Sequence, residues 1–457
     1  MTIKEKSLTH SISPAPVATC FGIRNISVFS SSFKASGGDG FFIIENGRIK
    51  DCGQITERPD FEEQLKNKNV QWLDGSGYMV IPGMINSHTH VAMSFFRDFC
   101  HGQSSMISEI FFPVESHLTK EWVRILSASS ILSGLRSGTT TFGDHYYLID
   151  GVVEALESFH VRGVVGETFG DLGTAFPSGE EKWQAIQKQI ENWNTSSRVR
   201  PALAPHAMDT VSPKMMEKIA TFARTKNLPL HFHLSQTQSE RNFCLKEYNK
   251  SPVRMAEDCG ALTEHSQVVH LVSADDEDLK RIKNSNATIG FCPASQVSYE
   301  KLAPIEKFID YGIPFTVATD CAASNDQMDL FSEMKIASLF MQDRLEITSF
   351  APELLLNAVT TVPAHVFGLK AQGDFQKGFE ADLVFVRDDL DRLPVSEPAA
   401  NLIFSTQSSH VDHVMIGGEW VLWKQRPVFV SVDDLKEEYL ELVGRIKSLP
   451  GVKKILE

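Results

Sequence analysis

The chain has 457 residues, long enough for about three ordinary domains, although one α/β barrel can take up about 250 residues by itself. Apolar residues make up 42% of the sequence and charged residues 22%, a composition that predicts a globular protein with a large core and excludes a chain dominated by disorder or low-complexity repeats. The formal net charge is −14, and an acidic surface repels nucleic-acid phosphates and anionic lipids, so we expect neither nucleic acid nor a membrane as a partner.

Cysteine usage and the apolar runs point to a cytoplasmic protein. The seven cysteines are an odd number, are scattered, and form no CxxC pair, which favours a reducing compartment over a disulfide framework. No apolar run reaches the length of about 18 residues that a membrane helix needs, and the first 20 residues lack the apolar core of a signal peptide.

Both ends of the chain are rich in short strand patterns. Residues 16–80 contain FGIRNISVF, VQWLDGSGYMV and DGFFIIENGRIKDCG, whose Asn-Gly pair predicts a hairpin turn. The same style returns near the end, where strands are expected over 381–387, 411–416 and 419–424. We therefore predict one small β-sandwich domain built from residues 1–80 and 370–457, the latter part including a terminal helix.

The centre of the chain alternates apolar, β-rich runs with helical patterns, which is typical of a parallel sheet. Eight such runs are present. The first ends near residue 86, and the other seven cover 138–144, 161–169, 200–206, 228–234, 266–272, 287–293 and 313–320. Eight units predict a (β/α)8 barrel, which we expect to cover residues 81–369 and to end with two helices around 350–369.

Histidines and one aspartate fall at the predicted carboxyl ends of these strands, where the active site of such a barrel lies. The residues are His88, His90, His206, His231, His233, His270 and Asp320. The period of two along a strand places His88 with His90, and His231 with His233, on common sides. Three imidazoles and a carboxylate suit Zn²⁺, Fe²⁺ or Mn²⁺, and such an ion lowers the pKa of a bound water toward about 7. The pattern therefore predicts metal-assisted hydrolysis.

The stretch PGMINSHTHVAMSFFRDF resembles the PG(L/M)IN-x-HTH-xx-M-xxxR segment of the amidohydrolase superfamily, and more narrowly its methylthioadenosine/S-adenosylhomocysteine deaminase and atrazine chlorohydrolase group. Further matches follow in the family's order: SGTTTFGDHYY, ALAPHAMDTVSP, LPLHFHLSQTQSE, VVHLVSADDEDLKRI, CPASQ and VATDCAASNDQMDLFSEMKIAS. The similarity runs from about residue 16 to about residue 425.

This resemblance implies a ligand set of His88, His90, His233 and Asp320, with His231 as a neighbour that is not a ligand. No lysine matches the bridging position of the binuclear members. One divalent ion per chain is therefore implied, with zinc expected and iron or manganese as the alternatives.

The resemblance also implies catalytic roles. His270 matches the histidine that hydrogen-bonds the attacking water or the leaving region of the substrate, and His206 matches the histidine that contacts the heterocycle. Asp320 is expected to serve both as a ligand and as the base that accepts the proton of the water.

One departure from the family concerns proton transfer. After the third histidine the deaminases usually read H-x-x-E, and that glutamate passes protons to the ring nitrogen, whereas here the position is Gln236. An amide can only donate and accept hydrogen bonds, so another group must supply this proton. Glu240 is a conceivable substitute, although its position favours a solvated helix face.

Another departure concerns the residues that read the substrate. The Glu-Trp pair that holds the ribose in the nucleoside deaminases is replaced by Ser105 and Met106, and the CPSSN loop ends in Gln296. Ser324 and Asn325 keep the family's AASN turn. We expect these five residues and His206 to bind the substrate, with Gln236 close to the reaction.

The expected protein is thus a metal-dependent hydrolase for a small aminated heterocycle of the purine, pterin, pyrimidine or triazine type, with deamination as the expected reaction. One alternative is a cyclic-amide or dechlorinating hydrolase of the same superfamily, whose reaction makes a different demand on the residue at position 236 and is more compatible with Gln236. The other is a catalytically silent metal-binding protein. We expect a homo-oligomer.

Overall fold

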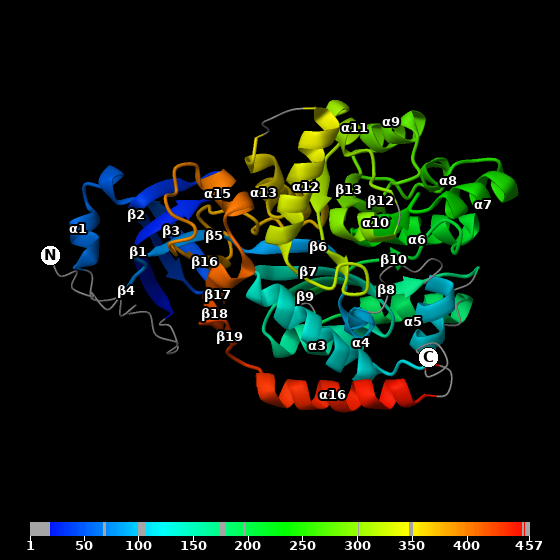
Figure 1. Cartoon of the computed structure of the whole chain (residues 1–457), viewed down its shortest axis with the longest axis horizontal. Coiled ribbons are helices and arrows are strands. Elements are labelled where there is room, and N and C mark those ends of the chain that lie inside the picture. Colours follow the sequence, from blue (N-terminus) through cyan, green and yellow to red (C-terminus); the bar gives the residue numbers. More distant parts are fainter. Residues whose placement is uncertain are drawn as a thin grey trace.

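The computed structural model describes residues 19–66, 70–98, 107–172, 179–194, 197–299, 301–346, 351–449 and 452. A strand-rich part built from both chain ends lies to the left in Figure 1, and the alternating helices and strands of the central region lie to the right. Of the helices in the described ranges, none is long and apolar enough to cross a membrane.

The strands of the central region confirm the predicted succession of β-rich runs. They are β6 (Met84–His90), β7 (Thr139–Tyr146), β8 (Arg162–Phe169), β9 (Val199–Pro201), β10 (Ala204–Pro205), β11 (Leu230–Leu234), β12 (Ser266–His270), β13 (Thr288–Phe291), β14 (Phe315–Val317) and β15 (Asp320–Cys321). Every residue of β11, β12 and β13 is buried, as expected of parallel strands covered on both faces.

Helices separate these strands along the chain. After β6 come η2 (Val91–Phe96), η3 (Ile107–Phe111), α2 (Phe112–Glu115) and α3 (Lys120–Arg136), and the later strands are separated by α4 (Ile149–Ser158), α5 (Glu180–Glu191), α6 (Pro213–Lys226), α7 (Gln238–Tyr248), α8 (Pro252–Asp258), α9 (Asp276–Ser285), α10 (Pro293–Tyr299) and α11 (Ile305–Asp310). The region ends with α12 (Leu330–Leu345), α13 (Glu353–Ala358) and α14 (Thr361–Val366). The last two are the helices expected around 350–369.

Parallel pairing arranges the central strands in two sheets. One has the order β10-β8-β7-β6-β15, with β9 also beside β8, and the other has the order β11-β12-β13-β14. A parallel bridge between Leu203 and Leu230 links the two sheets. The fold is therefore α/β with parallel sheets, and the carboxyl ends of the strands gather at one side.

Strands from both chain ends form one nine-stranded sheet. Its order is β19-β18-β17-β16-β5-β1-β2-β3, with β4 beside β1. The strands are β1 (Cys20–Phe29), β2 (Lys34–Glu45), β3 (Arg48–Gln54), β4 (Gln71–Asp74), β5 (Tyr78–Pro82), β16 (Leu383–Arg387), β17 (Val411–Ile416), β18 (Glu419–Trp423) and β19 (Arg426–Pro427). The amino- and carboxyl-terminal segments meet where β5 pairs antiparallel with β16.

The predicted Asn-Gly turn is present between β2 and β3. Asn46 and Gly47 both have positive φ, as the tight hairpin turn requires. The short helices of this part are η1 (Ile55–Glu57), α1 (Phe61–Leu65), α15 (Pro398–Phe404) and η4 (Ser408–His410).

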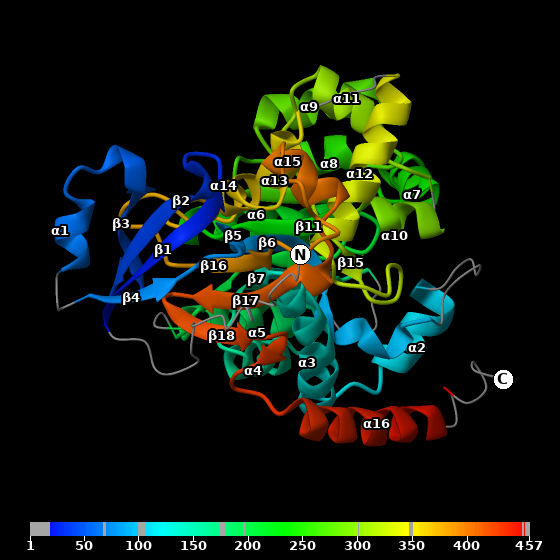
Figure 2. The same ribbon diagram turned by 60° about the vertical axis from the view of Figure 1, so that its left-hand side comes forward.

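The last long helix, α16 (Val432–Ser448), lies against the central region. It runs below α3 in both ribbon views (Figures 1 and 2). The Tyr439 hydroxyl donates to the Ser94 carbonyl over 2.8 Å, and Arg124 pairs with Glu438 over 3.1 Å. The carboxyl-terminal segment thus returns from the nine-stranded sheet to pack on the part that carries the histidines.

Candidate active site

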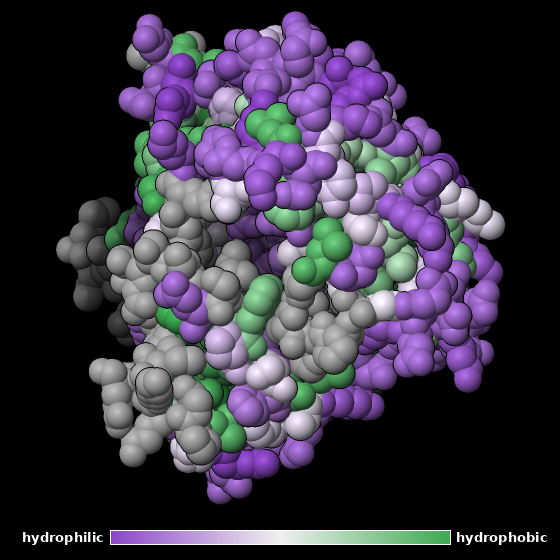
Figure 3. Space-filling view, turned by 90° about the vertical axis from the view of Figure 1, so that its right-hand side faces the viewer, coloured by the Kyte–Doolittle hydropathy of each residue, from purple (hydrophilic) through white to green (hydrophobic). Residues whose placement is uncertain are grey.

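Strand pairing brings the predicted site residues together at the carboxyl ends of the strands. β6 carries His88 and His90, β11 carries His231 and His233, and β12 ends at His270. β15 begins at Asp320, which is in register with Thr89, between the first two histidines. Figure 3 faces the right-hand side of Figure 1, toward which β6 runs, and shows a hollow near the middle of that face.

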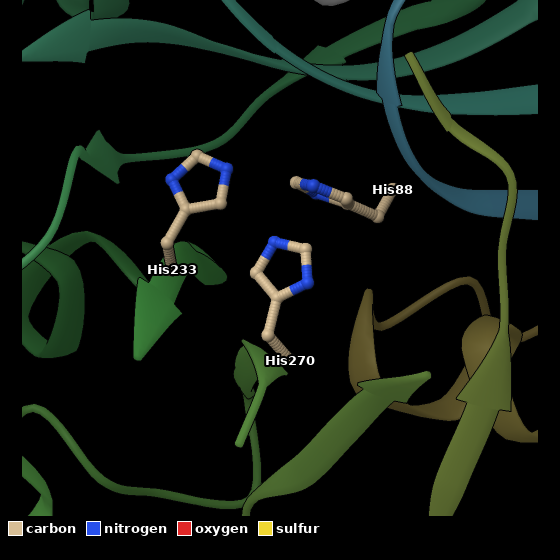
Figure 4. Close-up of side chains that lie close together, drawn as sticks. All are labelled: His88, His233 and His270. Carbon is tan, nitrogen blue, oxygen red and sulfur yellow. The ribbon is translucent and has the colours of Figure 1, made fainter. Parts of the chain in front are cut away.

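Polar atoms of four side chains converge in this site. Asp320 Oδ1 lies 3.6 Å from His88 Nε2 and 3.5 Å from His90 Nε2, and His90 Nε2 lies 3.2 Å from His233 Nε2. His270 belongs to the same group, because one nitrogen from each of His88, His233 and His270 lies within 4.8 Å of the other two. Figure 4 shows these three rings turned toward a common space.

Hydrogen bonds at the far side of two rings fix where their protons lie. His90 Nδ1 faces the His145 carbonyl, and His233 Nδ1 faces the His206 carbonyl over 3.0 Å. A carbonyl oxygen can only accept, so each Nδ1 carries a proton, and in the neutral ring each Nε2 presents a lone pair. In their neutral forms, His90 and His233 therefore direct these lone pairs toward each other.

These atoms fit a divalent metal ion. In a tetrahedral zinc site with bonds of about 2.0–2.1 Å, two ligand atoms lie about 3.3 Å apart, close to the separations given above. The buried His88 Nε2 has no hydrogen-bond partner among the described residues, as expected of an atom reserved for a metal. His145 fits less well as a ligand because its nitrogens already face the Pro205 carbonyl and the Thr168 hydroxyl.

Burial favours the neutral form of four of the clustered imidazoles, those of His88, His206, His231 and His233. Loss of solvation, followed by repulsion from neighbouring histidines, lowers the pKa of His88 and His233 well below the ordinary value. The pKa of His231 is lowered to about 3 and that of His206 to about 4, in both cases first by burial and then by His90. Metal binding requires neutral imidazoles, so this environment has the protonation state that an ion needs.

Three residues around the site have left-handed backbone conformations. The φ angles are 84° at His270, 62° at Asp320 and 50° at Ser235. Non-glycine residues rarely adopt such angles, and the associated strain of about 1–3 kcal/mol is typically retained where a side chain must be aimed.

Asp144, at the end of β7, holds the segment that carries His90. Its Oδ2 atom accepts from the Thr89 hydroxyl over 2.8 Å and from the Val91 N–H over 2.7 Å, while its buried Oδ1 has no partner among the described residues. Asp144 therefore lies behind the candidate ligand His90.

Asp320 is itself oriented by a hydroxyl. The Ser295 hydroxyl donates to Asp320 Oδ2 over 2.6 Å, which leaves Oδ1 facing His88 and His90. One carboxylate oxygen is thus held by the protein, and the other is directed into the histidine cluster.

Gln236 lies in the loop after β11 and is half-buried. Within the described residues its side-chain amide makes no hydrogen bond, whereas its backbone N–H donates to Glu240 Oε2 over 2.8 Å. The amide is therefore available to a substrate, which is compatible with the predicted place near the reaction.

The expectation that Glu240 lies on a solvated helix face is wrong. Its side chain is only 2% exposed, because it turns back over the start of α7 to accept backbone N–H groups. Burial, followed by the nearby Asp209 carboxylate, raises its pKa to about 8. The Thr-x-x-Glu spacing of 237–240 is typical of a helix start, but it does not predict these contacts with Ser235 and Gln236.

The other predicted substrate residues are engaged within the protein or lie outside the described residues. Gln296 donates to the His270 carbonyl and accepts from the Ala303 N–H, so it braces the His270 loop. Ser324 donates to the Cys321 carbonyl, and Asn325 donates to the Thr319 carbonyl and to Glu333. Ser105 and Met106 lie outside the described residues.

A separate cavity of about 570 Å³ lies at the opposite ends of the strands. Its lining includes Arg200, Leu228 and His265, each close to the beginning of a strand, and none of the predicted site residues. The histidine cluster and this cavity are therefore distinct.

Comparison with known proteins agrees with this geometry. Residues 79–421 match the model of the amidohydrolase family. The chain belongs to this family. As an amidohydrolase it is an enzyme that hydrolyses carbon–nitrogen bonds.

Curated relatives of this amidohydrolase are named as deaminases. It is 30% identical to a 5-methylthioadenosine/S-adenosylhomocysteine deaminase of Thermodesulfovibrio yellowstonii, over 90% of this chain and 94% of the relative. It is 32% identical to the protein of that name from Syntrophobacter fumaroxidans, over 89% and 94%. A 5′-deoxyadenosine deaminase of Methanosphaera stadtmanae is 30% identical, over 79% of this chain and 86% of the relative.

Solved structures share the fold. An adenosine deaminase from Xanthomonas campestris with bound zinc superposes with a TM-score of 0.87 at 22% identity, covering 95% of this chain and all of that one. The zinc complex of an atrazine chlorohydrolase from Arthrobacter aurescens TC1 gives a TM-score of 0.81 at 21% identity, covering 93% of this chain and all of that one.

Proposed function

We propose that this amidohydrolase is a metal-dependent hydrolase that deaminates a small aminated nitrogen heterocycle. The observation that carries the proposal is the convergence of His88, His90, His233 and Asp320, in which ring nitrogens and a carboxylate oxygen lie 3.2 to 3.6 Å from one another. The deaminase names of the curated relatives support the choice of reaction.

The proposed ligand set is His88, His90, His233 and Asp320, holding one divalent ion. Zinc is the expected ion, as in the two solved structures named above, with iron or manganese as the alternatives. A divalent ion held by these residues supplies Lewis-acid activation of a water molecule.

Asp320 is proposed as the base of the reaction. Its Oδ1 atom faces the site, and the bond from Ser295 fixes the carboxylate so that this oxygen can take a proton from the attacking water. In the reaction, the water oxygen adds to the ring carbon and the carbon–nitrogen bond to the amino group breaks. One proton of the water passes by way of Asp320 to the leaving ammonia, and the other ends on the ring nitrogen. A carbonyl group remains on the ring.

His270 and His206 are proposed to bind the reacting groups. The buried His270 Nε2 has no partner among the described residues, and burial lowers the pKa of His270 to about 4, so the ring meets the water or the leaving amine in its neutral form. His206 Nδ1 lies 2.8 Å from the Thr210 hydroxyl, which orients the ring and leaves Nε2 for the heterocycle.

The amide at position 236, in place of a glutamate, supports a second candidate function. The amide of Gln236 cannot relay a proton to a ring nitrogen but can orient a substrate by hydrogen bonds. A cyclic amide, or a ring that carries a good leaving group such as chloride, needs less help from this position. We therefore retain hydrolysis of a cyclic amide, which also breaks a carbon–nitrogen bond, as the alternative, and dechlorination is tested beside it.

We further propose a (β/α)8 barrel over residues 81–369 and a β-sandwich over residues 1–80 and 370–457. The Leu203–Leu230 bridge between the two parallel sheets and the pairing of β15 with β6 support barrel closure. In the nine-stranded sheet, the turn at Gly47 contacts the turn at Gly417, as expected if the sheet folds over itself.

The cellular setting remains a proposal as well. The described cysteines are free thiols, which supports a reducing cytoplasm. A homo-oligomer is expected, and light scattering on the purified protein would test it. We propose small-molecule substrates and no nucleic-acid or membrane partner.

The test of the function is an ammonia-release screen over aminated purines, pterins, pyrimidines and triazines, with cyclic amides and chlorinated triazines in parallel. Release of ammonia from at least one aminated ring, lost in His88→Ala, is the expected result. Ring opening or chloride release without ammonia would select the alternative, and no turnover of any substrate by metal-loaded protein would contradict both.

A further inference from the structure

Glu240 lies at the start of α7, but its carboxylate faces the loop that leaves the candidate active site. Its Oε1 accepts from the Ser235 N–H over 3.2 Å and its Oε2 accepts from the Gln236 N–H over 2.8 Å. These two amides follow the candidate ligand His233 by two and three residues. The carboxylate is thus bonded to the backbone of the residue whose side chain is proposed to meet the substrate.

This arrangement differs from ordinary helix capping. Thr237 caps α7 by accepting from the Glu240 N–H over 2.9 Å, so the sequence has a capping-box spacing. In a capping box the glutamate side chain returns to the N–H of the capping residue itself. The Glu240 carboxylate instead reaches the two residues before Thr237, which lie outside the helix.

The same carboxylate also reaches a second loop. The Met208 N–H, in the loop that follows β10 and carries His206, faces this carboxylate and favours its charged form. The buried carboxylate is bonded to two backbone amides of one loop and lies against a backbone amide of the other. Moving either loop away would leave a buried charge with fewer donors around it. The neighbouring Asp209 is the charged group that faces Glu240 from this second loop.

We propose that Glu240 is a positioning residue that holds the Gln236 loop and the His206 loop in register over the substrate. The inference rests on the proposed function, in which both side chains meet the heterocycle. Glu240 touches neither the substrate nor the proposed ligands, and it acts through the backbone of Ser235, Gln236 and Met208.

The first test is hydrogen exchange, which needs no substrate. In the parent the amides of Ser235, Gln236 and Met208 should exchange slowly, and in Glu240→Gln they should exchange about tenfold faster or more, because the substituted amide offers one acceptor and places a donor against an N–H. Arg241, whose N–H donates to the Thr237 carbonyl, should keep its protection. Faster exchange confined to the first turn of α7 would show that Glu240 only caps the helix and would overturn the proposal.

The second test is a double-mutant cycle on the hydrolysis that the parent catalyses. Glu240→Gln should lower kcat/KM by about 10- to 100-fold, as misplaced supporting groups typically do. In a Gln236→Ala background the same change should cost much less, because most of its effect passes through Gln236. An equal loss in both backgrounds would contradict the proposed route.

Glu167 provides the matched control. Its carboxylate is also buried and accepts two backbone amides, from Leu148 and Ile149, in a loop that carries none of the proposed site residues. Glu167→Gln should lower the melting temperature but leave kcat/KM within a few-fold of the parent. A loss of kcat/KM equal to that of Glu240→Gln would show that Glu240 contributes general stability only.

The two proposals fail in different ways. If the parent hydrolyses nothing but the exchange pattern holds, the proposed function is wrong and the link between the loops stands. If Glu240→Gln does not fold, exchange in the parent still decides, since fast exchange at Ser235, Gln236 and Met208 would rule out the link.

Discussion

The Nε2 atoms of His90 and His233 lie 3.2 Å apart, while the Nδ1 atom of each ring faces a backbone carbonyl. In their neutral forms both rings present lone pairs to each other, which is unfavourable unless a cation lies between them. Two separate carbonyls, those of His145 and His206, set this arrangement. Hydrogen bonds to the backbone thus orient the two candidate ligand rings without a metal ion.

Two variants separate the hydrogen bonds that Asp144 accepts from the negative charge that it carries. Because Oδ2 alone accepts from Thr89 and Val91, Asp144→Asn can keep both bonds, whereas Asp144→Ala loses both. We expect the alanine variant to bind zinc about 10- to 100-fold more weakly, and the asparagine variant to stay within a few-fold of the parent. Competition with a chromogenic chelator measures this. Equal zinc affinity in parent and Asp144→Ala would show that the segment carrying His90 does not depend on Asp144.

Asp320→Asn removes the proposed base while it leaves an oxygen near the histidines. Turnover should fall by about 100- to 10,000-fold, the usual range for general acid–base help. The steady-state rate is measured together with the metal content, so that loss of the ion is not mistaken for loss of the base. A variant that keeps its metal and a rate within a few-fold of the parent would exclude Asp320 as the base.

Gln236→Glu distinguishes the two candidate functions. If deamination is limited by proton delivery to the ring, a carboxyl group at this position should raise the rate of ammonia release. If the native substrate is a cyclic amide or carries a good leaving group, the ionised carboxylate offers no hydrogen-bond donor and activity should fall. Parent and variant are compared side by side on both substrate classes. Identical rates on every substrate would mean that Gln236 faces away from the chemistry.

Glu115 predicts a pH dependence of stability. Burial raises its pKa from 4.5 to about 7, only partly opposed by the bond that the Tyr146 hydroxyl donates over 2.7 Å. The pKa of Glu115 is higher in the folded than in the unfolded protein. Protonated Glu115 therefore contributes fully to the free energy of unfolding below its unfolded pKa, and this contribution is lost as the pH rises through about 7. Glu115→Gln keeps an acceptor for Tyr146 and removes the titration, so it should gain stability relative to the parent by up to about 3 kcal/mol over this window.

Urea unfolding between about pH 5 and pH 8 measures this difference in the free energy of unfolding. Glu437→Gln is the control, since that glutamate is exposed and makes no ion pair among the described residues, so its replacement should change nothing with pH. A difference between parent and Glu115→Gln that stays constant with pH would contradict the assignment.

The strands and the candidate ligands were predictable because their signals are local. The buried parallel strands contain short runs of apolar residues that favour strands, such as Val268 and Val269 in β12, and the two-residue spacing of His88 and His90 places both imidazoles on one side of β6. The Asn-Gly pair likewise specifies the turn between β2 and β3.

The supporting contacts were not predictable, because they depend on how loops from different strands meet. Glu240 occupies a position that favours solvent, and only the fold shows its carboxylate beneath the Ser235–Gln236 backbone. Gln296 was expected to read the substrate, yet both ends of its amide are bonded to the protein. Whether a polar side chain contacts a ligand or a neighbouring loop does not follow from the periodicity of the sequence.

The most direct test of the account is a metal titration coupled to ammonia release. Metal-free protein is reconstituted with increasing zinc, iron or manganese, and bound metal per chain is measured by elemental analysis alongside the rate on an aminated heterocycle found in the screen. We predict that the rate rises in proportion to occupancy and stops rising at one ion per chain. Two tightly held ions per chain, or ammonia release that is independent of metal content, would contradict the account.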